Sequence, residues 1–320
     1  MTPSDRVRLP GTLDTNKLGT FNPANDIQRL SRYYKYTGPA TYQKELYISD
    51  VWAGRRLELF MEQTRVTRVW VNGTEVSPST QSNLLPASQS YDLSENLQYG
   101  QYNRIAIEVD NSYPGMPSNP IVNSHMATDE TQTNWNGILG RFELQIQEAV
   151  FIRDLRVYPN ADLKTVLVEA DLQNRSGAAY SGNLTLCCAD GEERTLPAEL
   201  AAGEAKTVSL SDYAMPEDVK LWSEFETPLY QMTARLDNGA SREAEFGMRV
   251  FTNGNGSFAI NGNKVFLRGE ANCAVFPLTG YAPMDTAEWE KLFGTYKAYG
   301  IDAVRFHSWC PPARRICRRG

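Results

Sequence analysis

Three side chains that could contact a polar ligand recur at every second position of the stretch AVRFHSW, residues 303–309. They are Arg305, His307 and Trp309, and alternation along a strand would place all three on one face. An arginine can orient a carboxylate by charge-assisted hydrogen bonds, a histidine can hydrogen-bond a hydroxyl group, and an indole can stack on a sugar ring. The alternative for each residue is a packing or hydrogen-bonded side chain at the rim of a larger fold.

The residues before this stretch predict a helix that would help to position it. DTAEWEKLFGTYKAYG offers Asp285 or Thr286 as the N-cap and Gly300 as the C-terminal stop. Apolar residues recur between them at helical spacing, namely Trp289, Leu292, Phe293 and Tyr296.

A hairpin and a strand are predicted just before this helix, in GSFAINGNKVFLRGEANC, with Asn261 and Gly262 at the turn. A strand, a helix and a second strand in this order form a βαβ unit of a parallel sheet or barrel. A complete barrel takes about 250 residues. Residues 251–320 therefore predict only the beginning of such a domain.

The rest of the sequence predicts two β-sandwiches. From about residue 40 to 148 short strands follow one another with period-two alternation, and Asn72-Gly73 marks a hairpin between VWV and TEV. A second block, residues 150–250, shows about seven strands with polar turns, the immunoglobulin-like pattern without its Cys–Trp–Cys signature.

Composition excludes several classes of protein. The 320 residues carry a net charge of −6, which gives no electrostatic case for nucleic acid or an anionic membrane. No apolar run approaches the ~18 residues of a membrane span. The N-terminus lacks the apolar core of a secretory signal, so we expect a cytoplasmic chain as written, or a periplasmic or secreted one if the N-terminus has been trimmed.

Neither a disulfide framework nor a metal site is expected. The five cysteines are odd in number, and Cys187 and Cys188 should point to opposite faces of one strand. Cys273, Cys310 and Cys317 lack the paired spacing of a zinc site, and His125 has no second histidine or cysteine nearby.

Several stretches, in this order, resemble glycoside hydrolase family 2, the group of β-galactosidases, β-glucuronidases and β-mannosidases. They are LPGTLD, WVNGTEV, NWNGILGRFEL, LWSEFETPLYQM, and FAINGNKVFLRGEAN followed by the helix and GIDAVRFHSW. The resemblance implies a mainly β fold with three parts. These are a galactose-binding-like jelly roll in residues 1–149, an immunoglobulin-like sandwich in 150–250, and the first βαβ unit of a truncated TIM barrel in 251–320.

The resemblance also implies a retaining exo-β-glycosidase without an organic cofactor, acting on a terminal β-linked sugar, with β-galactosides favoured. Such enzymes use two carboxylates about 5 Å apart. The family places them on the fourth and seventh barrel strands, so we expect no catalytic residue in this chain and no activity from it. The full-length parent could be a homo-oligomer.

Substrate contacts are predicted by the same resemblance. Arg305 corresponds to an arginine that recurs in the family's second barrel strand, and the region of Asn134 and Trp135 can reach the barrel mouth, although a packing loop is an equal alternative. After LRG many members have a histidine, which this chain lacks; Glu270 and Asn272 lie near that place instead. This departure predicts an altered sugar specificity.

The basic tail ARRICRRG does not resemble the helix that follows CPP in the family. We interpret it as a frameshift product, with a weak anion-binding patch as the alternative. Two other classes of function stay open. One is a non-catalytic carbohydrate-binding β-sandwich protein, and the other is a structural adhesin or scaffold.

Overall fold

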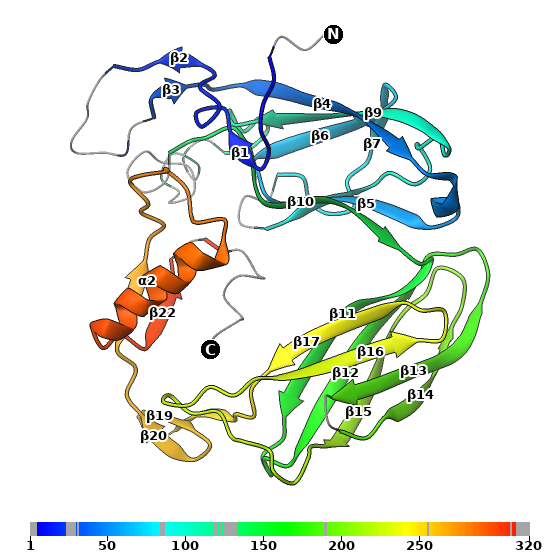
Figure 1. The fold of residues 1–320 in the computed structure, drawn as a ribbon, viewed down its shortest axis with the longest axis vertical. Helices are drawn as coiled ribbons and strands as arrows, with labels where there is room; N and C mark the ends of the chain where they lie inside the picture. Colours follow the sequence, from blue (N-terminus) through cyan, green and yellow to red (C-terminus); the bar gives the residue numbers. More distant parts are fainter. Residues whose placement is uncertain are drawn as a thin grey trace. The chain divides into compact units, whose positions relative to one another are not determined.

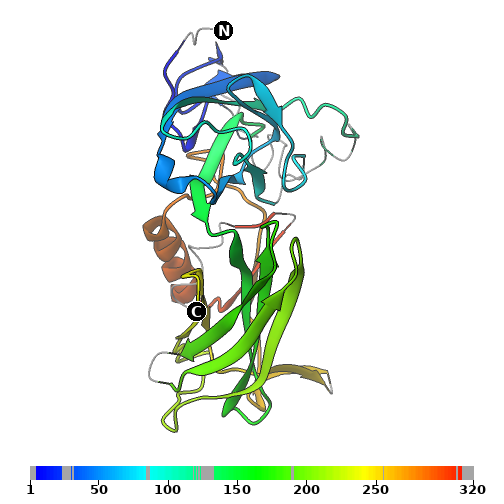
Figure 2. The same ribbon diagram turned by 90° about the vertical axis from the view of Figure 1, so that its right-hand side faces the viewer.

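The structure is a computed structural model. It describes residues 5–23, 30, 32–83, 87–117, 119, 121, 123, 133–188, 191–254, 256–307 and 309–311. His125 and the basic tail lie outside these residues. The chain forms two compact units, one of Met1–Ile146 with Arg268–Ile316 and one containing Gln147–Leu267. Figures 1 and 2 show strands throughout both units and the helix α2 in the C-terminal segment.

The first unit contains two four-stranded sheets that enclose a hydrophobic core. One has the order β4-β9-β6-β7, with bounds Pro39–Ile48, Gln101–Asp110, Val66–Val71 and Thr74–Val76. The other has the order β1-β10-β5-β8, with bounds Gly11–Thr12, Gly137–Gln147, Arg56–Gln63 and Gln89–Asp92. The short elements β2 (Thr20–Phe21), β3 (Tyr34–Lys35) and η1 (Asp50–Trp52) complete this part.

Side chains at every second position of the strands fill the space between these sheets, as the period-two pattern predicts. Buried residues from both sheets meet there, among them Leu57, Leu59, Met61, Val69, Val71, Ile105, Ile107 and Val109. The predicted hairpin is confirmed, because Asn72 and Gly73 join β6 to β7 at φ angles of 52° and 90°.

The second unit is also a sandwich with its own core. One sheet has the order β11-β12-β15, with bounds Val150–Pro159, Thr165–Asn174 and Ala205–Ala214. The other has the order β14-β13-β16-β17, with bounds Arg194–Leu200, Tyr180–Cys188, Tyr230–Leu236 and Ser241–Phe246. Cys188 is buried and Cys187 is partly exposed, and neither forms a disulfide, so the predicted alternation is confirmed.

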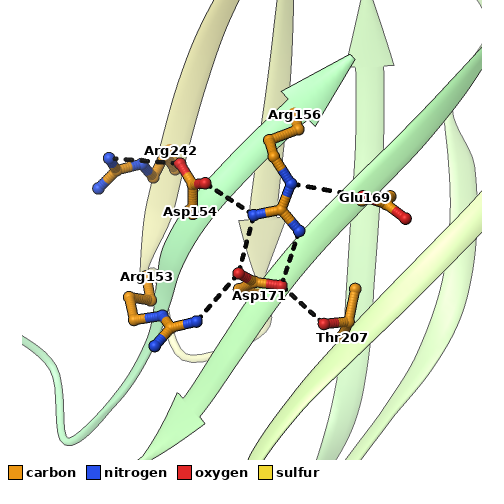
Figure 3. Close-up of polar contacts among 7 residues, drawn as sticks. All are labelled: Arg153, Asp154, Arg156, Glu169, Asp171, Thr207 and Arg242. Carbon is orange, nitrogen blue, oxygen red and sulfur yellow. Dashed lines mark hydrogen bonds and ion pairs between the residues drawn. The ribbon is translucent and has the colours of Figure 1, made fainter. Parts of the chain in front are cut away.

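A network of charged side chains covers part of this second sandwich (Figure 3). The Arg156 guanidinium donates to Asp171 at 2.8 and 3.0 Å, to Asp154 at 2.7 Å and to Glu169 at 3.3 Å. Hydrogen bonds from Arg156, joined by those of Thr207 and Arg153, hold the pKa of the Asp171 carboxyl well below its ordinary value, although burial acts in the opposite sense. The network is therefore a set of mutually compensated charges.

A three-stranded sheet follows in the same unit, formed by β18 (Phe251–Gly254), β19 (Ser257–Ile260) and β20 (Asn263–Val265). Asn261 and Gly262 join β19 to β20 at φ angles of 51° and 80°. The second predicted Asn-Gly hairpin is thus confirmed as well.

The C-terminal segment of the first unit contains β21 (Gly269–Asn272), α2 (Thr286–Ala298) and β22 (Ala303–Phe306), and the two strands pair in parallel. Asp285 is the N-cap, because its side chain accepts a hydrogen bond from the Glu288 N–H at 2.9 Å. The predicted apolar face of the helix buries Trp289 completely, in a cluster that also contains Tyr113 of the first sandwich. This shared cluster explains why the segment belongs to the first unit.

Within the described part of the chain no helix is long and apolar enough to cross a membrane. The same residues contain no group of three or more His, Cys, Asp or Glu side chains that could hold a metal ion.

Candidate functional site

The carboxyl ends of β21 and β22 lie side by side, because Glu270 pairs with Val304 and Asn272 with Phe306. Residues paired across two strands point to the same face of the sheet. The Phe306 ring meets the Trp289 ring of α2 edge-on, with centroids 6.1 Å apart. Glu270 and Asn272 therefore lie on the face that the helix covers.

This orientation corrects the prediction that Asn272 faces a substrate. Its side chain is only 7% exposed, donates to the Tyr296 phenol oxygen at 3.2 Å and accepts from the Ala274 N–H at 2.9 Å. Because Ala274 has a φ of 61°, the second contact holds the chain in a conformation that residues other than glycine rarely adopt. Asn272 thus shapes the loop after β21.

Glu270 has a similar position beside the helix. One of its carboxylate oxygens, Oε2, is buried and has no hydrogen-bond partner among the described residues. Burial raises the pKa of the Tyr296 phenol, and the Glu270 carboxylate raises it further, while the Asn272 hydrogen bond opposes them. Glu270 thus lies beside Tyr296 of α2, and its predicted contact with a substrate stays a prediction.

Arg305 lies on the opposite face of the strand pair, since it is paired with Ala271 and is exposed. Strand residues of a barrel alternate between the interior and the surrounding helices. The face away from α2 is the one that would line a barrel interior, which is the orientation expected of Arg305. Its predicted role toward a substrate stays a prediction.

Trp309 does not share the face of Arg305, because it packs with Phe306 and with Trp289 of α2. The His307 backbone N–H and the Trp309 indole N–H both donate to the Asn272 carbonyl, at 2.9 and 3.0 Å. The His307 side chain is half-buried. The expectation of one shared face is therefore wrong for Trp309, and the predicted role of His307 stays a prediction.

Trp309 is also corrected from a sugar-stacking residue to a core residue. It is 4% exposed and stacks on Trp289, with centroids 6.1 Å apart and an interplanar angle of 23°. Phe306 contacts it edge-on at 5.1 Å. Neither face of the indole is available to a ligand in this arrangement.

Asn134 and Trp135 form part of a seam between the first sandwich and the loop after β21. The Asn134 side chain accepts from the Tyr113 hydroxyl at 2.7 Å and donates to the Asn111 carbonyl at 2.9 Å. Trp135 is 2% exposed and packs with Leu139 and Tyr281. These contacts favour the packing alternative over contact with a substrate.

The loop on the other side of this seam contains a glycine that lies close to the first sandwich. Gly280 has a φ of 73°, and a Cβ atom added to it would lie 2.8 Å from the Thr133 hydroxyl. A side chain at this position would meet both a strained backbone and a steric clash. The two segments therefore approach each other as closely as a glycine permits.

Sequence reasoning missed Arg65, which lies at the centre of this seam with 0% exposure. Its Nε donates to the Trp135 carbonyl at 3.1 Å, and its Cζ lies 3.7 Å from the centroid of the Trp135 ring. The signal was present, because Val71, Val69 and Thr67 are buried in alternation and the next position in phase is Arg65.

Residues 150–249 match the family described as glycosyl hydrolases family 2. No curated protein matches the sequence.

Solved structures show a similar fold over most of the chain. A family 2 member from Bacteroides cellulosilyticus has a TM-score of 0.75 at 19% identity, with 97% of this chain and 41% of that chain covered. A β-galacturonidase from Eisenbergiella tayi, bound to galacturonate, has a TM-score of 0.68 at 17% identity, with 87% and 47% covered. A β-glucuronidase from Bacteroides uniformis has a TM-score of 0.68 at 17% identity, with 95% and 36% covered.

This chain spans less than half the length of each of these structures. Residues 150–249 are thus similar to glycosyl hydrolases family 2, and the fold of the chain is similar to that of these solved structures.

Proposed function

We propose that this chain is the non-catalytic, N-terminal side of a retaining exo-β-glycosidase that acts on a terminal β-linked sugar. In this proposal the first sandwich is a jelly roll, the second is an immunoglobulin-like domain, and β21, α2 and β22 are the start of a TIM barrel. The supporting observation is the parallel pairing of β21 with β22, with α2 between them in sequence, after a segment that matches family 2 and the short sheet β18–β20.

The carboxylates of the β21–β22 segment support placing the catalytic pair outside this chain. Retaining enzymes need two carboxyl groups about 5 Å apart and open to substrate. Glu270 faces α2, Asp285 caps that helix, and Asp302 forms an ion pair with Arg268. Each of these three acids thus has a structural role, and we do not propose any of them as the catalytic acid/base or nucleophile.

Arg305 is the residue of this segment that we propose acts toward the active site. It is exposed on the face opposite α2. An arginine there can hold a catalytic carboxylate ionised and oriented through two parallel hydrogen bonds. It would be a positioning residue for a carboxylate supplied from elsewhere.

A direct test is to incubate the purified 320-residue chain with p-nitrophenyl β-galactoside, β-glucuronide and β-galacturonide. We expect no release of p-nitrophenol, because both catalytic carboxylates are proposed to lie elsewhere. Turnover that copurifies with the chain would contradict the proposal. The coding DNA read downstream in three frames is the second test, and a barrel continuation with an Asn-Glu pair and a later Glu at strand ends is the expected result.

A second candidate function, carbohydrate binding without catalysis, is favoured by one observation on the first sandwich. Tyr47 and Tyr102 are paired across β4 and β9, are 53% and 68% exposed, and meet edge-on with centroids 5.5 Å apart. Exposed rings with polar edges suit sugar faces. If this function holds, Tyr47→Ala with Tyr102→Ala abolishes binding of β-galactosides in calorimetry, whereas Tyr158→Ala, at a tyrosine 47% exposed, has no effect.

A further inference from the structure

Two buried N–H donors of the first unit belong to one stacked pair of side chains, Arg65 and Trp135. The guanidinium lies on the indole, with its Cζ 3.7 Å from the ring centroid. The Arg65 Nε donates to the Trp135 carbonyl at 3.1 Å, and its Nη2 donates to the Thr133 carbonyl at 3.5 Å. The Arg65 Nη1 and the Trp135 Nε1 are buried and have no hydrogen-bond partner among the described residues.

Among the described residues, no carboxylate pairs with Arg65. Its two acceptors are neutral carbonyls, and the guanidinium of Arg32 adds a second positive charge nearby. Burial lowers the pKa of Arg65, and Arg32 lowers it further, while Tyr113 acts in the opposite direction. An arginine nonetheless stays protonated in proteins. A buried charge of this kind is normally paired, because removal from water is costly.

We propose that the Arg65 Nη1 and the Trp135 Nε1 bind one small monovalent inorganic anion, with chloride as the abundant physiological member of that class. Such an ion accepts hydrogen bonds from both donors and neutralises the guanidinium in one step.

The number of free donors favours this class of ligand over others. A carboxylate presents two oxygens with about four lone-pair positions, and a phosphate presents more oxygens and a higher charge. Two N–H groups would leave most of those acceptors unsatisfied in a buried site. A water molecule could satisfy the donors but would leave the charge of Arg65 uncompensated.

The position of the site gives the anion a structural consequence. Trp135 packs with Leu139 and Tyr281, and Thr133 faces Gly280 across the seam. An ion held by Arg65 and Trp135 would therefore fix the seam between the first sandwich and the loop after β21. A ligand that binds only the folded chain also stabilises it.

The site is tested first by crystals of the full chain grown in sodium gluconate and soaked in sodium bromide. The expected result is an anomalous peak within hydrogen-bonding distance of both the Arg65 Nη1 and the Trp135 Nε1. Bromide peaks confined to the surface would overturn the proposal. A carboxylate of the chain itself seated on Nη1 would overturn it equally.

The second test separates a functional ion from an adventitious ion only. Thermal unfolding is followed in sodium chloride and in sodium gluconate at one ionic strength, so that general screening is equal. We expect the melting midpoint of the wild type to rise by several degrees in chloride. Trp135→Phe, which keeps a stacking ring but removes the Nε1 donor, should lose at least half of that rise.

A matched control is Trp70→Phe, because Trp70 also stacks with an arginine, Arg68, that is already paired with Glu75 at 2.7 Å. It should keep the full response to chloride. An equal response in Trp135→Phe and Trp70→Phe would overturn the proposal, as would a bromide peak at Arg65 without any effect of chloride on melting. Arg65→Met should abolish the response; if it does not fold, the Trp135→Phe comparison decides.

Discussion

Arg65 in the first unit and Arg156 in the second unit are both held by oxygen atoms, but the oxygens differ in charge. Arg156 donates to the carboxylates of Asp154, Glu169 and Asp171 on a partly exposed face. Arg65 is fully buried and donates to two backbone carbonyls beneath an indole ring. Among the described residues, Arg156 is compensated by carboxylates, whereas Arg65 has only neutral protein acceptors.

The difference indicates what each arginine contributes. At the surface water can replace a lost partner, so each ion pair of a network contributes little by itself. In the interior no water replaces the lost side chain, and every group that it served becomes unsatisfied. We therefore expect the stability of the fold to depend more on Arg65 than on Arg156.

The largest effect should come from Arg65→Ala. The substitution leaves a cavity beneath Trp135 and removes the donors of the Thr133 and Trp135 carbonyls. We expect the free energy of unfolding of the first unit to fall by about 3–5 kcal/mol. Urea unfolding followed by tryptophan fluorescence measures it.

Arg68→Ala is the matched control for this experiment, because Arg68 lies close to Arg65 in sequence and also stacks on a tryptophan but is exposed. We expect a change too small to shift the urea midpoint measurably. If Arg65→Ala unfolds at the same urea concentration as Arg68→Ala, burial is not what distinguishes the two arginines.

An intermediate effect is expected from acid acting on the Arg156 network. The native pKa of Asp171 lies below the ordinary value of 3.8, chiefly because of the hydrogen bonds from Arg156. Its stabilising contribution is therefore present above pH 3.8 and is lost as the pH falls through the lowered native pKa. The melting midpoint of the second unit, residues 147–267, should decline over that acidic range.

Asp171→Asn isolates this contribution, since the amide cannot titrate. The variant should melt at a lower temperature at neutral pH and show a flatter decline on acidification. Parallel curves for the variant and the wild type would mean that other carboxyls of the second unit dominate its response to acid.

The smallest effect should come from Arg305→Ala. Arg305 is exposed on the free face of β22. Its removal should change the free energy of unfolding by less than ~0.5 kcal/mol, as is usual for exposed side chains. A clear loss of stability would instead show that Arg305 holds the strand pair together, and would argue against its proposed role toward a catalytic carboxylate.

Local signals predicted much of the fold. Asn72-Gly73 and Asn261-Gly262 require backbone conformations that few residues adopt, so each specified its hairpin without reference to the rest of the chain. Asp285 likewise marked the start of α2 through a contact only three residues away. Such features depend on neighbours in sequence, and a single sequence contains that information.

The candidate site was harder to predict because it depends on which face of a strand is covered. Alternation indicated that Glu270 and Asn272 share a face, but only the packing of α2 decides that this face points inward. Trp309 is buried against Trp289, and nothing in the alternation of AVRFHSW predicts that position. Arg65 continues the alternation of buried residues before β6, so its burial could have been predicted. It was missed because arginine is rarely fully buried.

The stacked indoles of Trp289 and Trp309 also have an optical consequence. Two rings 6.1 Å apart and nearly parallel, enclosed by Phe276 and Phe306, are close enough for their electronic transitions to couple. Coupled indoles give a paired positive and negative band in circular dichroism. One ring comes from α2 and the other from the segment after β22. The paired bands would therefore show whether these two parts of the C-terminal segment are packed together.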